Sequence, residues 1–212
     1  MSLQGRATKI GVATATISEM TVDLVGPRGA FGRLDVPAIK MGSLGADITI
    51  VDQMVTIIDM EAFKAFVQAI IQEETLILRL ENGKTTVKSM GMKSSIVYSK
   101  VIHLKGFKLL EASLRHVERD TDSMSSTIAI VNPSQFEVDL GSVIYEVQDS
   151  QGNRIGEQRG ATRVQRGESS LKLQGPVTGT ISNGVTRFVG VDVEEENWFK
   201  EILRSVSLVV TV

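Results

Sequence analysis

Hydrophobic and polar residues alternate along most of the chain, which is the period-2 pattern of half-buried strands. β-branched residues are frequent in these segments, and turns such as Gly26-Pro27-Arg28-Gly29 separate them. Regular short strands joined by turns are typical of a β-sandwich. The segments predicted as strands are residues 14–25, 31–39, 48–58, 75–80, 84–88, 95–104, 110–117, 127–131, 136–147, 154–164, 170–173 and 185–189.

The clearest turn signal is Asn82-Gly83, which lies between two strand-like runs. Asn and Gly both tolerate the positive φ angles of a two-residue type I′ turn. The sequence therefore predicts a β-hairpin whose strands cover residues 75–80 and 84–88.

Two segments break the alternating rhythm and predict short helices. The first follows Asp59, whose carboxylate suits a helix N-cap, and carries apolar residues at i, i+3, i+4, i+7 and i+8. Those residues are Phe63, Phe66, Val67, Ile70 and Ile71. The second follows the acidic run 194–196, which suits the positive end of a helix dipole. Its apolar residues are Trp198, Phe199, Ile202 and Leu203.

The two predicted helices align with each other. Phe66 corresponds to Trp198, and Leu76 in the following strand corresponds to Leu208, both at a shift of 132 residues. A repeat of this length is typical of a duplicated domain, and the alternative is a chance alignment of two β-rich halves. We predict two tandem immunoglobulin- or fibronectin-like β-sandwiches, residues 1–108 and 109–212, each with one short helix. Val212 lies inside an apolar strand pattern, which is more typical of a chain that continues.

Composition excludes several classes of function. With 23 Lys and Arg against 25 Asp and Glu, the net charge is −2, so no overall field attracts nucleic acid or an anionic membrane. The chain has no Cys, which excludes disulfides, thiolate metal sites and a Cys nucleophile, and its 2 His argue against a multi-His metal site. No window approaches the ~20 apolar residues of a membrane-spanning helix.

No motif declares a catalytic chemistry. Gly83-Lys84-Thr85 is similar to the end of a phosphate-binding loop, but Leu78 stands where that loop needs glycine. His103 and His116 lie in strand patterns outside any nucleophile elbow, so we expect partly exposed strand histidines. The acidic run 120–122 is not followed by the glycine and glutamate of a calcium loop at the needed spacing. Two interpretations of the run 192–196 stay open, a weak calcium site and solvated acids at a helix N-terminus. We expect no cofactor and no bound metal.

A local basic bias runs through the middle of the chain. It consists of Lys84, Lys88, Lys93, Lys100, Lys105 and Lys108. Two interpretations stay open. Lysines can contact the phosphate headgroups of a membrane, or they can lie on solvated strand faces and sheet edges, where they discourage aggregation.

One segment of the second half resembles a known domain family. In residues 127–141 an apolar strand runs into Asn132-Pro133-Ser134, and a second alternating strand follows and ends at Gly141. This pattern resembles the signature of late-embryogenesis-abundant type 2 domains, also called water-stress and hypersensitive-response domains. The stretches around Ile155-Gly156 and residues 166–170 are also similar to that family.

The first half is similar to a fungal family of membrane-anchored proteins built from such domains. The matching segments are residues 22–27, 31–37, 58–63, 74–76 and 83–87. The first half departs from the pattern because it lacks an Asn-Pro pair. The resemblance implies seven-stranded sandwiches without enzyme activity. It also implies a location at the fungal vacuole membrane, on the luminal side, through a transmembrane anchor outside this chain.

Three functions stay open at this point. The first is a non-catalytic structural or binding module, whose target is a protein partner or a second copy of the chain. The second is a lipid-binding or lipid-transfer module with an apolar groove under the helices, as opposed to closed core packing. The residues predicted to line that groove are Phe63, Phe66, Val67, Ile70, Trp198, Phe199 and Ile202. The third is a hydrolase that uses an unrecognised carboxylate site.

Overall fold

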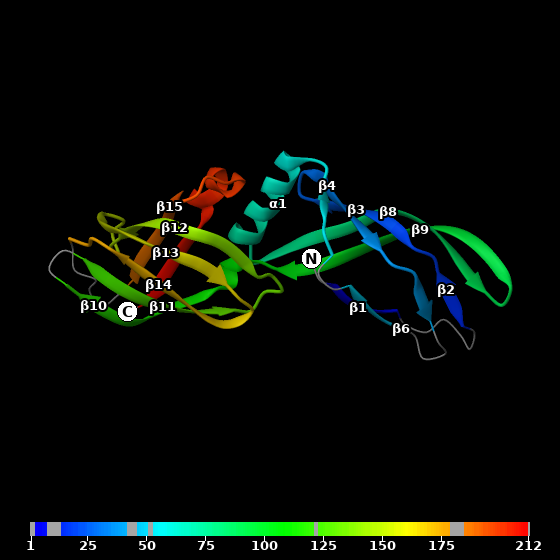
Figure 1. Ribbon diagram of the computed structural model, residues 1–212, viewed down its shortest axis with the longest axis horizontal. Coiled ribbons are helices and arrows are strands. Elements are labelled where there is room, and N and C mark those ends of the chain that lie inside the picture. Colours follow the sequence, from blue (N-terminus) through cyan, green and yellow to red (C-terminus); the bar gives the residue numbers. More distant parts are fainter. Residues whose placement is uncertain are drawn as a thin grey trace. The chain divides into compact units, whose positions relative to one another are not determined.

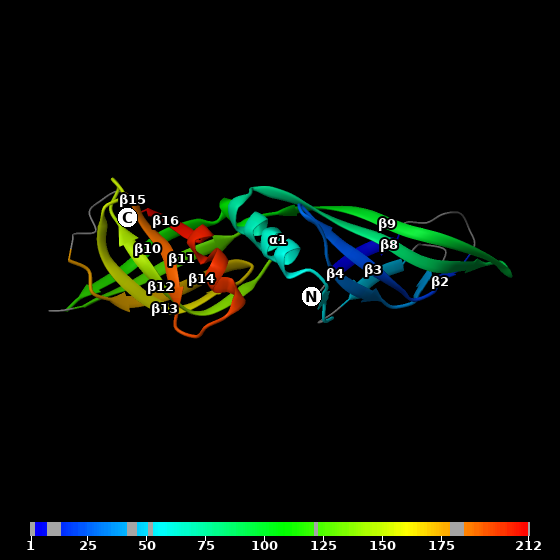
Figure 2. The ribbon, with the colours of Figure 1, turned by 90° about the horizontal axis from the view of Figure 1, so that it is seen from above.

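The computed structural model describes residues 3–7, 14–41, 46–50, 53–120, 123–178 and 185–211. Strands make up most of these residues, which confirms the prediction of a mostly β chain. The chain divides into two compact units. The first consists of Met1–Phe66 and Ile77–His103, and the second of Val67–Leu76 and Leu104–Val212. Figures 1 and 2 show the ribbon of each unit from two directions.

Some sequence predictions concern residues that the structure does not describe. Thr121 and Asp122 of the acidic run 120–122, residues 51 and 52 of the strand predicted over 48–58, and Val212 lie outside the described residues. The predicted domain boundary between residues 108 and 109 stays a prediction.

The first unit is built from an open sheet and a separate two-stranded ladder. Its strands are β1 (Leu3–Ala7), β2 (Ala15–Ile17), β3 (Met20–Gly26), β4 (Gly29–Val36), β5 (Ile39–Met41), β6 (Ala46–Ile50), β7 (Thr56–Ile57), β8 (Thr75–Ser89) and β9 (Met92–Lys105). The sheet has the order β5-β2-β8-β3-β4-β7, and β9 pairs with β8. The ladder is β1 with β6. Ile17 pairs with Val87 and Leu24 with Leu80, so β2 and β3 follow each other along β8.

The core of the first unit follows the alternation seen in the sequence. Leu78 and Leu80 of β8 are buried, while Ile77 and Arg79 are exposed. Further buried residues come from β3 and β4, namely Val22, Leu24, Phe31 and Leu34. Burying such a side chain stabilises the fold by about 1.5–3 kcal/mol. This shared apolar face therefore holds the central strands of the sheet together.

The predicted hairpin turn at Asn82-Gly83 is wrong. β8 runs through this position without a break, and Asn82 takes a left-handed φ of 59° inside the strand. Asn82 Nδ2 donates to Asp23 Oδ2 at 2.8 Å, so its side chain links β8 to β3. A Cβ on Gly83 would come within 2.9 Å of Val22 Cγ1. The Asn-Gly pair therefore allows β8 and β3 to pack closely against each other.

The chain reverses instead at Met90-Gly91. Both residues have positive φ, 50° and 79°, as in a two-residue type I′ turn. This turn joins β8 to β9 and makes a long hairpin, the teal and green arrows of Figure 1. Positive φ is common for Gly and enriched for Asn, Asp and His, but it is uncommon for Met. In the sequence, Met90-Gly91 therefore carries a weaker turn signal than Asn82-Gly83, although the turn is at Met90-Gly91.

The second unit contains a sheet that closes on itself. Its strands are β10 (Glu111–Arg119), β11 (Met124–Asn132), β12 (Val138–Gln148), β13 (Arg154–Val164), β14 (Gly167–Gly175), β15 (Val185–Val193) and β16 (Ser207–Thr211). The closed order is β10-β11-β14-β13-β12-β15-β16. A short parallel contact completes the ring, where Ala112 pairs with Val210 and Ser113 with Thr211.

The interior of this closed sheet is apolar and well covered. Alternate residues of β11 and β12 point inward, as the sequence pattern predicts. The hydrophobic residues that are completely or almost completely buried are Ile128, Ile130, Val143, Tyr145, Val147, Leu171, Leu173, Phe188, Leu203 and Val210. Every strand except β10 and β13 contributes to that set.

Both predicted helices are present. Helix α1 (Met60–Gln72) begins after Asp59, whose Oδ1 accepts a hydrogen bond from Ala62 N at 2.9 Å, which confirms the predicted cap. Its residues 60–66 belong to the first unit and its residues 67–72 to the second. Within the described residues, no helix is long and apolar enough to cross a membrane.

The second predicted helix forms as a tighter 3-10 helix. Helix η2 (Trp198–Ser205) begins after Asn197, whose Oδ1 accepts from Phe199 N at 2.9 Å. The sequence predicted its position, and the acidic run 194–196 lies just before the cap residue Asn197. A shorter 3-10 helix, η1 (Phe107–Leu109), follows β9.

Replacing Gly83 with Ala tests the role of the Asn-Gly pair. The new Cβ would overlap Val22 Cγ1, so we expect Gly83→Ala to lower the free energy of unfolding by about 1–3 kcal/mol. Urea denaturation measures the loss. The matched control is Lys84→Ala at the exposed neighbouring position, which should change stability by less than about 0.5 kcal/mol. Equal stabilities of the two variants would contradict the close approach.

Candidate functional site

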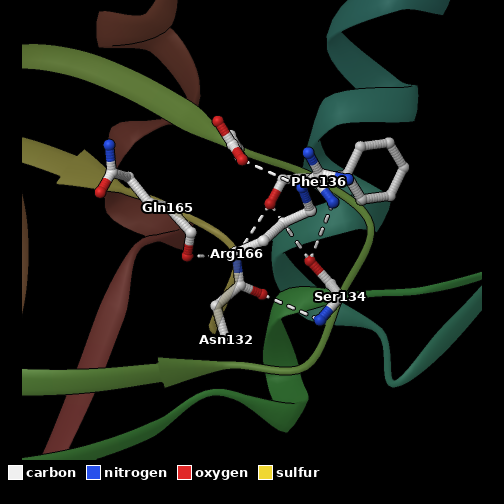
Figure 3. A network of polar contacts seen from close by, with 6 residues as sticks. Asn132, Ser134, Phe136, Gln165 and Arg166 are labelled. Atoms are coloured by element: carbon white, nitrogen blue, oxygen red, sulfur yellow. Dashed lines mark hydrogen bonds and ion pairs between the residues drawn. The ribbon is translucent and has the colours of Figure 1, made fainter. Parts of the chain in front are cut away.

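The most distinctive polar cluster lies where β11 ends, at the Asn132-Pro133-Ser134 motif (Figure 3). Asn132 is only 2% exposed. Its Nδ2 donates to the carbonyl oxygens of Phe136 at 2.8 Å and Gln165 at 3.1 Å. Its Oδ1 accepts from the Ser134 amide at 3.0 Å. Both amide hydrogens and the carbonyl oxygen of this side chain are therefore used inside the unit.

Ser134 completes the loop that follows Asn132. The Phe136 amide donates to Ser134 Oγ at 3.2 Å, and Ser134 Oγ lies 3.5 Å from the Phe136 carbonyl oxygen. The ring of Phe136 contacts the ring of Phe107 edge-on, with centroids 6.4 Å apart. Because Pro133 lacks a backbone N–H and cannot continue the ladder of β11, the side chains of Asn132 and Ser134 replace the missing strand hydrogen bonds.

The cluster joins two connections that lie far apart in the sequence. Asn132 reaches Gln165 in the turn between β13 and β14, and it pairs with Gly167, which has a φ of 75°. At the surface above it, Arg166 Nε donates to Glu137 Oε1 at 2.9 Å. This hydrogen bond is the main reason why the pKa of Glu137 is lowered from its ordinary value. The Asn132-Pro133-Ser134 motif thus ties the β11–β12 loop to the β13–β14 turn.

The first two predicted groove residues lie in the core of the first unit. The Phe66 ring stacks on the Phe31 ring, with centroids 4.5 Å apart and planes inclined by 18°. Phe63 lies beside Phe31 at 5.9 Å. A Cβ on Gly26 would be 3.0 Å from Phe66 Cδ2, so the helix packs closely on the end of β3. These aromatic side chains fill a packed contact between α1 and the sheet.

The next two predicted groove residues belong to the second unit. Val67 and Ile71, one turn apart on α1, pack against its hydrophobic core, and Ile70 is buried. The end of the helix is held close to the start of η1, because the Gly106 amide donates to the Glu74 carbonyl oxygen at 2.8 Å. A Cβ on Gly106 would be within 2.9 Å of the Ile70 carbonyl oxygen.

The last three predicted groove residues separate on η2. Phe199 and Ile202 are buried in the same core of the second unit as Leu203. Trp198, the single Trp of the chain, is 41% exposed and lies edge-on to Phe199 with ring centroids 5.6 Å apart. The structure therefore distributes the seven predicted residues over two packed cores and one exposed aromatic side chain.

The acidic run before η2 forms surface ion pairs. Lys200 Nζ lies 3.1 Å from Asp192 Oδ1 and 3.6 Å from Glu196 Oε1, and Arg159 pairs with Glu194 at 3.5 Å. The Val193 amide and then Lys200 lower the pKa of Asp192. Hydrogen bonding to Asp192 raises the pKa of Lys200. Across the part of the chain that the structure describes, no three His, Cys, Asp or Glu side chains are placed to hold a metal ion.

The two histidines have the surroundings that the sequence predicted. His103 is exposed on β9. His116 is exposed on β10, and its Nε2 lies 2.9 Å from Glu118 Oε1 on the same strand. Neither histidine is accompanied by a nucleophile in a described contact. These positions give no support to a general base.

Sequence analysis missed a set of buried polar side chains in the second unit. Tyr145 is fully buried, and its hydroxyl lies 2.9 Å from Thr162 Oγ1. Gln158 is buried as well and its Nε2 donates to the Met124 carbonyl oxygen at 2.8 Å. The period of 2 along β13, which places residues 158, 162 and 164 on one face, was the signal that could have found them.

Comparison with known proteins gives a family and no functional relative. Residues 29–147 match the model of a family described as "Protein of unknown function (DUF3712)". No curated protein sequence matches the chain significantly. Among solved structures, the crystal structure of red sea bream transglutaminase is matched at 13% identity with a TM-score of 0.31. That match covers 100% of this chain and 29% of the transglutaminase, and a similarity this low carries no argument.

Truncation of Asn132 tests the structural role of the motif. We expect Asn132→Ala to lower the free energy of unfolding by about 3 kcal/mol, because two carbonyl oxygens and one amide lose their partner. Thermal and urea denaturation measure the effect. The matched control is Gln165→Ala, since Gln165 contributes its carbonyl group and its exposed side chain points away from the cluster in Figure 3. A loss below about 1 kcal/mol for Asn132→Ala would contradict this role.

The buried phenol of Tyr145 predicts a stability loss at alkaline pH. Burial raises the pKa of Tyr145 to about 12, against 10 for a free phenol. Its stabilising contribution is therefore complete below pH 10 and is lost as the pH rises from about 10 to about 12, a change of about 2–3 kcal/mol. Urea denaturation between pH 10 and pH 12 should show a smaller loss of unfolding free energy for Tyr145→Phe than for the wild-type chain.

The second tyrosine provides the control for that measurement. Burial also raises the pKa of Tyr98, which lies in the first unit and is less buried. Tyr98→Phe should keep most of the alkaline decline of the second unit. If the second unit loses the same stability at alkaline pH in wild type and in Tyr145→Phe, then the Tyr145 phenol does not control that loss.

Proposed function

The chain belongs to the DUF3712 family, and from this premise we propose that it is a non-catalytic structural and binding module. The observation that carries the proposal is the Asn132 cluster. Both amide hydrogens and the carbonyl oxygen of the Asn132 side chain bind backbone groups of the same unit. A motif that stabilises loops in this way supports a scaffold and not a reaction centre.

The charge state of the acidic side chains also supports a non-catalytic role. Asp23, Glu137, Asp149 and Asp192 are the described carboxyl groups with a clear shift, and the pKa of each is lowered. Hydrogen bonds from neighbouring donors cause these shifts. A general acid of a hydrolase needs the opposite, a pKa raised toward neutral pH. These groups therefore act as stable surface anions.

We propose Trp198 as the centre of a protein-binding surface on the second unit. An exposed Trp supported by a buried aromatic ring is typical of binding hot spots. The buried ring of Phe199 supplies that support through an edge-on contact with the Trp198 ring. The exposed residues Glu194, Glu195 and Glu196 lie two to four residues before Trp198. Arg159 and Lys200 pair with Glu194 and Glu196, and the remaining acidic charge favours a partner with a cationic surface around an apolar contact.

The lipid-groove alternative has weaker support. It needs apolar side chains that line an open channel, whereas Phe66 and Phe199 are buried in packed contacts. Closed core packing accounts for six of the seven residues. We therefore place the binding function at the surface and not beneath the helices.

We further propose that residues 1–108 and 109–212 are related copies of one β-sandwich. In each copy a helix precedes a strand, α1 before β8 and η2 before β16, at the common sequence shift. The resemblance to late-embryogenesis-abundant type 2 domains supports a luminal or extracellular role at a membrane, such as that of the fungal vacuole, through an anchor outside the chain. The protein partner would then be reached on that side.

Photo-crosslinking tests the binding surface directly. A photoreactive phenylalanine analogue placed at Trp198 should capture a discrete partner in cells that express the protein. The matched control is the analogue at Val131, another residue of the second unit with a similar exposure, 40% against 41%. Capture of the same proteins from both positions, or of none from position 198, would contradict the proposal.

A further inference from the structure

The hairpin of β8 and β9 exposes an unusual number of apolar side chains. Met90 is 81% exposed and Met92 71%, both at the tip, and Val97 and Val101 on β9 are also exposed. Residues 97 and 101 share one face of β9 with Lys93, because side chains alternate along a strand. Both views in Figures 1 and 2 show the tip extending past β2 of the same unit.

The part of this hairpin that follows Glu81 carries positive charge without acidic residues. Residues 82–110 contain six Lys and no Asp or Glu. Four of these lysines lie on the hairpin in the first unit and are exposed, namely Lys84, Lys88, Lys93 and Lys100. Lys40 of β5 adds to them, because Lys40 and Lys88 pair with Thr16 from its two sides. Because side chains alternate along a strand, Lys93 and Lys100 lie on opposite faces of β9. The hairpin is therefore cationic on both faces, although the whole chain has a net charge of −2.

The tip combines this charge with a turn that is poorly suited to its residue. Met90 has a φ of 50° at a position where Asn is the preferred residue of a type I′ turn. An apolar side chain that is both exposed and placed on unfavourable backbone contributes little to folding. Backbone strain at an exposed side chain indicates that Met90 contacts another molecule and not its own unit.

We propose that the β8–β9 hairpin docks on an anionic lipid bilayer. The methionines at the tip would enter the boundary between headgroups and acyl chains, and the lysines would contact the anionic headgroups. A strand of another protein is a weaker candidate for this edge, because edge lysines oppose strand addition. The inference goes beyond the function proposed above. It does not depend on Trp198.

Vesicle binding by the full chain tests the charge requirement. We expect the chain to sediment with vesicles of phosphatidylserine and phosphatidylcholine but not with vesicles of phosphatidylcholine alone. Binding should disappear at 1 M salt, where the screening length falls to about 3 Å. Replacing Lys84, Lys88, Lys93 and Lys100 with Ala should weaken binding about fivefold for each lysine removed. The charge-matched control replaces Arg115, Arg163, Lys172 and Arg187 of the second unit and should bind like wild type.

A second variant tests the tip without risk to folding. Met90→Asn places the preferred residue in the turn, so the hairpin should fold at least as well, while vesicle binding should fall about tenfold. The control is Met54→Asn, an equally exposed Met of the first unit outside the hairpin, which should bind like wild type.

Three results would overturn the proposal. The first is no binding of the wild-type chain to the phosphatidylserine vesicles. The second is that Met90→Asn binds vesicles as well as Met54→Asn, and that the four-lysine variant binds as well as its charge-matched control. The third is a chain that does not bind vesicles but forms a dimer in sedimentation velocity that Met90→Asn abolishes. That result would assign the hairpin to a second copy of the chain. None of these results depends on capture of a partner at Trp198.

Discussion

The second unit depends on a short parallel contact between β10 and β16. Ala112 and Ser113 pair there with Val210 and Thr211, and this contact turns the other six neighbouring strand pairs into a closed ring. Closure pairs the backbone groups that an edge strand would otherwise expose. It also fixes the interior, where Tyr145, Phe188 and Leu203 are fully buried. The polar Asn132 cluster lies at a rim of the ring and holds two of its connections.

The first unit lacks an equivalent contact among its described strands. Its sheet stays open, and β9 pairs with β8 as an outer strand. The first unit has a long hairpin with exposed lysines and methionines, of which Met90 is 81% exposed. The exposed large apolar residues of the second unit are less exposed, and they are Val117, Val131, Val185, Trp198 and Val209.

Local patterns predicted much of the fold. Asp59 and the apolar stripe after it specified α1, and the run from Trp198 to Leu203 specified the position of η2. The strand alternation placed β11, β12 and β13 correctly. These features depend on contacts between residues close in sequence or on a repeated period, so one sequence is enough to find them.

Features that depend on distant contacts were missed or misassigned. Asn82-Gly83 has the residues of a turn, but Asp23 and Val22 from another strand hold it inside β8. The true turn at Met90-Gly91 carries a weaker turn signal. The candidate groove residues were correctly identified as apolar, yet their division between two cores depends on where α1 passes from one unit to the other. Asn132 was singled out by resemblance, and its structural role becomes visible only with the turn at Gln165 in place.

The contrast between a closed and an open sheet is the central claim, and residue-resolved amide hydrogen exchange tests it most directly. The account predicts slow exchange for the paired amides of β10 and β16 around Ala112 and Val210. On β9 it predicts an alternating pattern, with amides that face β8 protected and those that face outward exchanging rapidly. Continuous protection along β9, or exchange in β10 and β16 as rapid as at that outer strand, would contradict the account.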